Sequence, residues 1–212
     1  MTPNPYIFPP RKAEIANSFT HGLGILFSLT VIVVLLLGSL NSSFSNRFSL
    51  FIFALSMLIM YSVSTIYHAT KNTEQKTVLR LFDHISIYFL IAGTYTPFIL
   101  LCLHGNLKWV FFCIIWGIVM LGIIYKLVWW KQHPKLSLYI YLAMGWIIVF
   151  IIKPMYQSLP TESFVWLIAG GIFYSVGTIF YANRKPLYNH AIWHLFVLAG
   201  SVSHFLAVIT IR

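Results

Sequence analysis

Two histidines in the stretch His190-Ala191-Ile192-Trp193-His194 are the first residues whose spacing suggests chemistry. Side chains at positions i and i+4 of an α-helix lie on one face, about one turn apart. Two imidazoles held in this way can bind one zinc ion, as in the HExxH motif, where a glutamate after the first histidine is the general base. Ala191 occupies that position here, so any carboxylate base must come from elsewhere. The alternative is that both histidines are interfacial or hydrogen-bonded side chains without a metal.

A third imidazole and a carboxylate could complete such a site. His68 would be the third ligand, because three neutral imidazoles with one open position form the arrangement of a catalytic zinc site. The metal would polarise a bound water and lower its pKa toward neutrality. Asp83, which we take as the only acid within an apolar segment, could accept that water's proton or orient it. Alternatively, Asp83 forms an ion pair with Arg80 or interacts with a positive helix N-terminus.

Four further polar residues fall in apolar segments. Ser64 lies one helical turn before the third histidine and could hydrogen-bond the water or a ligand, or bond back to a helix carbonyl. His21 and His84 could orient a metal ligand through hydrogen bonds, or could be structural. His204 follows His194 by ten residues, about 15 Å along a helix, so it is a poor candidate for direct ligation.

The elements that must position these residues are membrane helices. The chain has 212 residues, of which 59% are hydrophobic and only 8% are charged, whereas a soluble domain carries about 25% charged residues. The apolar residues form blocks long enough to cross a bilayer. The sequence therefore predicts an all-α membrane protein with one domain, residues 1–212, and seven transmembrane segments: 17–40, 48–69, 79–103, 109–130, 136–153, 164–182 and 190–211.

The net charge of +10 predicts an orientation rather than a nucleic-acid partner, because the cations lie between apolar blocks. One set of alternate connections carries ten of them: Arg11, Lys12, Lys71, Lys76, Arg80, Lys126, Lys131, Lys135, Arg184 and Lys185. The other set carries four: Arg47, Lys108, Lys153 and Arg212. This excess predicts a multi-pass plasma-membrane protein with its N-terminus in the cytoplasm and its C-terminus outside.

This orientation brings the candidate residues to one depth. The second segment would end near the inner face at His68, and the third would begin there with Asp83 and His84. The first and seventh segments would also begin there, with His21 and the histidine pair. We therefore expect one site near the inner leaflet, in contact with membrane lipid.

Several motifs of the chain resemble the hemolysin III family of bacterial membrane proteins. That family lies within the superfamily of progestin and adiponectin receptors and is distantly related to alkaline ceramidases. The resemblance covers nearly the whole chain and rests on these stretches: Glu14-Ile15-Ala16-Asn17 through His21-Gly22, Ser64-Thr65-Ile66-Tyr67-His68, Asp83-His84, Gly93-Thr94-Tyr95-Thr96-Pro97, His190-Ala191-Ile192-Trp193-His194 and Ser203-His204-Phe205. It implies a seven-helix bundle with zinc bound by His68, His190 and His194, a zinc-bound water held by Asp83, and Ser64 beside it.

Three functions are compatible with these sequence features. The first is a zinc-dependent hydrolase, similar to a ceramidase, that cleaves an amide or ester bond of a membrane lipid. The second is a pore-forming or cytolytic protein, which the family name implies. The third is a receptor or regulator in which zinc is structural. The absence of a charged or repeated polar stripe disfavours a pore, while the substrate and the oligomeric state stay open.

Overall fold

Seven helices are long and apolar enough to cross a membrane, as the sequence predicts. The computed structural model describes residues 8–129, 136–183 and 186–211. Every regular element in these ranges is helical, so the predicted all-α class is confirmed. The elements are α1 (Arg11–Gly38), α2 (Phe44–Ala69), α3 (Thr73–Cys102), α4 (Gly105–Val128), α5 (Leu136–Gly145), a 3₁₀ segment (Trp146–Ile151), α6 (Ile152–Ser158), α7 (Thr161–Ala182) and α8 (Asn189–Ile209).

The helices extend beyond several predicted segments. The first begins at Arg11 rather than Asn17, and the third begins at Thr73, where the Asn72 side chain accepts the backbone N–H of Gln75 at 3.0 Å. Such a side-chain cap satisfies a free donor of the first turn, so a polar start of a helix is stable. The fifth span continues to Ser158 through the 3₁₀ segment. Some residues of the predicted segments and loops lie outside the described ranges: Trp130, Lys131, Lys135, Arg184, Lys185 and Arg212.

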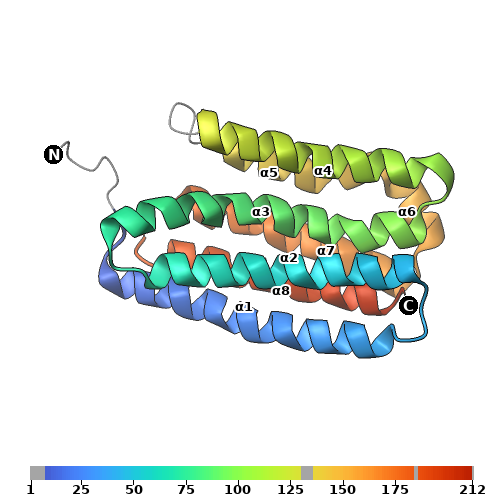
Figure 1. Ribbon diagram of the computed structural model, residues 1–212, viewed down its shortest axis with the longest axis horizontal. Coiled ribbons are helices and arrows are strands. Elements are labelled where there is room, and N and C mark those ends of the chain that lie inside the picture. Colours follow the sequence, from blue (N-terminus) through green and yellow to red (C-terminus); the bar gives the residue numbers. More distant parts are fainter. Residues whose placement is uncertain (1–7, 130–135, 184–185, 212) are drawn as a thin grey trace.

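The helices run roughly side by side, with α3 in the interior and α4 and α5 along one edge (Figure 1). Helix α1 packs against α2 and α8, and α7 packs against α8. Large apolar side chains such as Phe44, Phe150 and Leu121 are exposed on the outside of the bundle. An apolar outer surface of this kind is suited to lipid rather than water, so the bilayer surrounds the helices.

Two of the cations counted in the predicted loops are buried instead. Lys76 and Lys126 are 4% and 1% exposed, and each has a polar partner inside the protein. A buried ammonium is retained only when such partners replace its hydration. Lys76 lies near the start of α3, and Lys126 lies near the end of α4. Both are therefore at the same end of the bundle.

A close contact between α1 and α2 lies in the interior near this end of the bundle. The Tyr61 ring of α2 lies where a Cβ on Gly24 of α1 would be, so only a glycine leaves room for it. The Tyr61 hydroxyl donates to Ser201 Oγ of α8 at 2.7 Å. Tyr61 therefore joins α1, α2 and α8 where they converge.

Candidate metal site

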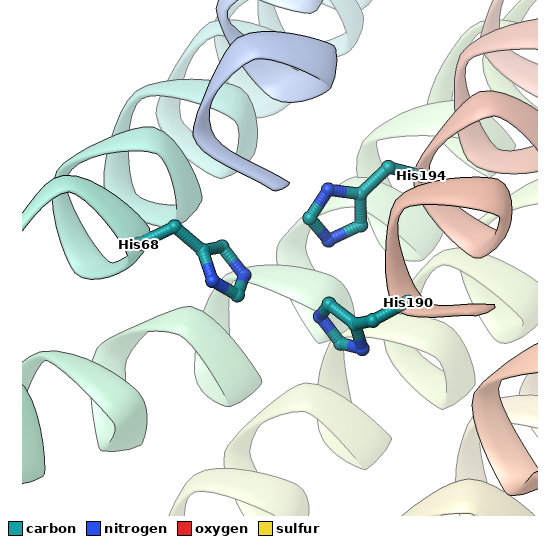
Figure 2. A group of neighbouring side chains, drawn as sticks. All are labelled: His68, His190 and His194. Atoms are coloured by element: carbon teal, nitrogen blue, oxygen red, sulfur yellow. The ribbon is translucent and has the colours of Figure 1, made fainter. Parts of the chain in front are cut away.

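Three histidines from two helices face one another at the end of the bundle where α1 and α8 begin and α2 ends (Figures 1 and 2). His68 is next to the last residue of α2, and His190 and His194 lie in the first turns of α8. Their potential ligand atoms all lie within 4.8 Å of one another. One ion with metal–nitrogen bonds of about 2.0–2.1 Å could bind all three after small ring movements.

The His68 ring has one nitrogen held by protein and one left over. Its Nδ1 lies 2.5 Å from Glu14 Oε2, and Asn17 Nδ2 lies 3.4 Å from the same nitrogen. Its Nε2 is buried and has no hydrogen-bond partner among the described residues. An Nδ1–H that donates to a carboxylate leaves the Nε2 lone pair available, as metal-ligating histidines normally arrange it.

His194 is oriented in the same way by helix α1. Its Nδ1 lies 3.1 Å from the Asn17 carbonyl oxygen and 3.0 Å from Thr20 Oγ1. Since the Thr20 hydroxyl already donates to a carbonyl of its own helix, Nδ1–H is the donor to the Asn17 carbonyl. The two buried histidines therefore fit a metal ligand set, and three neutral imidazoles suit zinc and several other transition metals.

Glu14 is a buried acid at the candidate site, and its contact with His68 was not predicted from the sequence. We took Asp83 as the only acid within an apolar segment, which is wrong, because α1 begins at Arg11 and buries Glu14 to 5% exposure. Lys76 Nζ lies 3.1 Å from Glu14 Oε1 and donates to the carbonyl oxygens of Tyr67 and Thr70 at the end of α2. The lysine thus ties the carboxylate to the helix that carries His68.

The signal that could have found Glu14 is its spacing. Glu14, Asn17 and His21 stand at positions i, i+3 and i+7, which places them on one helix face. That face would have been recognised if the predicted helix had started three or more residues earlier, at or before Glu14. The polar residues before Asn17 concealed it.

Asp83 and Ser64 lie together at the cavity beside the three histidines. Both line this cavity, and Ser64 is close enough to hydrogen-bond the Asp83 side chain. Asp83 is 9% exposed, and Ser64 is 1% exposed. The structure therefore places the predicted carboxylate and hydroxyl side by side next to His190 and His194, which line the same cavity.

His21 and His84, the two histidines predicted to orient a ligand, have different neighbours: His21 contacts His194, and His84 contacts Lys126. The His21 ring stacks on the His194 ring with centroids 3.4 Å apart, and both of its nitrogens lack a hydrogen-bond partner among the described residues. His21 therefore touches a candidate ligand through its ring face. The His84 Nδ1 lies 3.1 Å from Lys126 Nζ, and its carbonyl accepts the Tyr141 hydroxyl at 2.7 Å.

The cavity continues from this site into the bundle. Its wall is mostly apolar and is formed by α3, α5, α7 and α8, with Ile91, Leu142 and Ile172 among the lining residues. The site therefore lies at one end of an elongated apolar space, which is suited to a hydrocarbon chain.

The seven apolar spans and a buried group of three histidines that could hold a metal ion define a multi-pass membrane protein with an internal candidate metal site. The chain belongs to the haemolysin-III related family, whose model matches residues 11–205. The predicted resemblance to hemolysin III is thus confirmed. A location in the plasma membrane fits the family and the seven apolar helices.

Its relatives extend from bacteria to animals. The chain is 44% identical over 199 residues to the "Hemolysin-3 homolog" of Bacillus subtilis (strain 168), with 93% of each chain covered. It is 42% identical over 199 residues to "Hemolysin-3" of Bacillus cereus, covering 93% of this chain and 91% of the relative. The human "Monocyte to macrophage differentiation factor" is 28% identical over 210 residues, covering 94% and 84%.

Proposed function

We propose that this protein is a zinc-dependent hydrolase that cleaves an amide or ester bond of a membrane lipid. The observation that carries the proposal is the meeting of three imidazoles with Asp83 and Ser64 at one end of an apolar cavity. A metal and a neighbouring carboxylate are the groups that hydrolysis needs, and an apolar cavity suits a lipid chain. Residues 1–212 would act as a single membrane domain.

Each polar residue has a distinct role in this proposal. His68, His190 and His194 would hold the zinc ion, which when bound acts as a Lewis acid and makes water a stronger nucleophile near neutral pH. Glu14 and Asn17 hold the rings of the two buried ligands through Nδ1. The proton that the attacking water loses would pass to a carboxylate oxygen of Asp83. Asp83 would then give this proton to the amine or alcohol that leaves as the acyl bond breaks.

The hydroxyl of Ser64 and the walls of the cavity would complete the reaction site. Ser64 would hold the Asp83 carboxylate by donating a hydrogen bond to it, so that one oxygen stays directed toward the cavity. The apolar wall would bind the lipid chain and keep bulk water away from the bond that is cleaved. His21 would fix the His194 ring by stacking against it.

We place this site on the cytoplasmic side of the membrane. The basis is the excess of Lys and Arg in the connections at the end where α1 begins. If the buried Lys76 and Lys126 are left out of the count, eight cations of that set still stand against four in the other set. The substrate would then be a lipid of that leaflet.

A turnover experiment tests the proposal. The full-length protein in lipid nanodiscs is incubated with ceramide-like N-acyl lipids and with ester lipids, and the release of fatty acid is followed. We expect release that stops after a chelator removes the metal and returns when zinc is added. Zinc-loaded protein that releases no fatty acid from either lipid class would contradict a hydrolase and leave a structural metal as the alternative.

The names of the two Bacillus relatives favour a second candidate, a cytolytic membrane protein. The cavity of the described chain gives this candidate little support, because its wall is mostly apolar and a water-filled pore needs polar lining. A cytolytic protein should release dye from liposomes whether or not it carries metal. Dye release that is unchanged by His68→Ala would favour it over the hydrolase.

A further inference from the structure

The deep end of the cavity contains a histidine that none of the roles above employs. His204 lies on α8 ten residues beyond His194, about 15 Å farther along the helix. It is 5% exposed and lines the same cavity as His190, His194 and Asp83. Its Nδ1 is buried without a hydrogen-bond partner among the described residues.

The neighbouring polar groups are satisfied, which makes His204 an exception. Thr94 of α3 donates to the Leu90 carbonyl at 2.8 Å, and the Tyr174 hydroxyl of α7 lies 3.0 Å from Ser201 Oγ. More than nine-tenths of buried polar groups in proteins have such a partner, so an unpartnered imidazole requires an explanation. A partner that enters through the cavity is the simplest one.

The protein makes room for this ring. A Cβ on Gly170 would lie 2.6 Å from both Nε2 and Cε1 of His204, so the imidazole occupies space that any other residue at position 170 would need. The rings of Tyr174 and Phe98 lie against it, with centroid distances of 5.3 and 6.3 Å. The ring is therefore packed closely between α3 and α7.

The stretch of cavity between the two sites is mostly apolar. Ile87 and Ile91 of α3 and Val197 of α8 line it between the metal-site residues and His204. A lipid whose reacting bond lies at His190 and His194 would extend its chain along these side chains toward His204. Among the described residues along this wall, Thr94, Ser175 and Thr178 donate their hydroxyls to helix carbonyl oxygens. His204, in contrast, has an Nδ1 without a hydrogen-bond partner.

We propose that His204 recognises a hydroxyl group part-way along the acyl chain of the lipid that this cavity binds. A neutral imidazole offers one donor and one acceptor, and a hydroxyl can pair with either. A span of roughly 15 Å corresponds to about 12 carbons of an extended chain, so the hydroxyl would lie near carbon 12. The proposal rests on the proposed function for the placement of the carboxyl end, but binding does not require hydrolysis.

A binding experiment with fatty acids tests this proposal separately from catalysis. Affinities of the full-length protein in nanodiscs are measured for stearic acid, 12-hydroxystearic acid and, as a positional control, 2-hydroxystearic acid. We expect the 12-hydroxy acid to bind about tenfold more tightly than stearic acid, and the 2-hydroxy acid to gain much less. Equal affinities of stearic and 12-hydroxystearic acid for the wild-type protein would overturn the proposal.

Two variants identify the residue responsible. His204→Phe keeps a ring of similar size and should remove the preference while leaving the affinity for stearic acid within about twofold. His204→Gln, which again offers a donor and an acceptor, should restore part of it. A preference that persists in His204→Phe would overturn the assignment to His204. If His204→Phe does not fold, the positional series on the wild-type protein still decides. A preference for 12-hydroxystearic acid in a protein that shows no lipid turnover would contradict the proposed hydrolase activity. It would not contradict the hydroxyl-binding site at His204.

Discussion

The Glu14 carboxylate of α1 lies 2.5 Å from Nδ1 of His68, which is next to the last residue of α2. This contact explains how a histidine on one helix is directed toward two histidines on another. The carboxylate holds the Nδ1 side of the ring, and the buried Nε2 has no partner within the described part of the chain. Lys76 fixes the carboxylate in turn, so the position of His68 depends on α1, α2 and α3 together.

Glu14→Gln tests this contact. Glutamine keeps an acceptor for Nδ1–H but loses the negative charge that makes the imidazole a better ligand, so we expect zinc affinity to fall about 10–100-fold. The affinity is measured by competition with a chelator of known strength. Glu162→Gln, the same change at an exposed position in the first turn of α7, is the control and should leave the affinity unchanged. Equal zinc affinities of the two variants would mean that Glu14 does not act on the metal.

Asp83→Asn separates catalysis from metal binding. Asparagine has nearly the same shape but cannot accept a proton as a carboxylate does, so we expect lipid turnover to fall about 10²–10⁴-fold. The zinc content should stay at the wild-type level, because Asp83 is not one of the three ligands. Turnover and zinc content are measured on the same preparation, with Glu74→Gln at an exposed position of α3 as the control. Full activity of Asp83→Asn would contradict the assigned role.

Gly24→Ala tests the packing that supports the site. The added methyl group would collide with the Tyr61 ring, which must move and disturb its contact with His21. We expect a loss of about 1–3 kcal/mol in stability, measured by thermal and denaturant unfolding in detergent. Gly22→Ala is a matched control on the same helix, because a Cβ there meets nothing within 4 Å. Similar stabilities for the two variants would show that the contact between Gly24 and Tyr61 is not tight.

The orientation of the bundle can be tested with single cysteines. In a variant without Cys102 and Cys113, Asn41→Cys lies in the connection between α1 and α2, and Lys71→Cys lies between α2 and α3. With the N-terminus in the cytoplasm, a thiol reagent that does not cross membranes should label position 41 on intact cells. It should label position 71 only after the cells are permeabilised. The opposite labelling pattern would place the histidines on the outer side.

Much of the fold could be predicted because membrane helices are long and apolar. A block of about 20 apolar residues has few stable alternatives in a bilayer, so the number of spans followed from hydropathy. The ends were less predictable, since Thr73 to Arg80 is helical although it is polar, and its stability depends on the Asn72 cap and on contacts with α2. The 3₁₀ segment at Trp146–Ile151 has no marker in the apolar pattern.

The positions of the candidate residues followed from the direction of the helices, but their partners did not. Successive membrane spans start at opposite ends of the bundle, and this rule alone brings His68, Asp83 and His190 to one depth. Which atom of His68 is held, and by which residue, depends on the rotation of α1 against α2. That rotation is set by side-chain packing, such as the contact between Gly24 and Tyr61. A contact between two helices cannot be predicted from the spacing of residues within one helix.

The most direct test of the account is the zinc content of the purified protein. Elemental analysis of the wild-type protein should find about one zinc per chain, because three imidazoles meet once in the described structure. His68→Ala and His194→Ala should lose most of it, whereas His104→Ala, an exposed histidine between α3 and α4, should keep it. A wild-type protein without stoichiometric zinc after zinc loading, or equal zinc in all four proteins, would contradict the metal site at His68, His190 and His194.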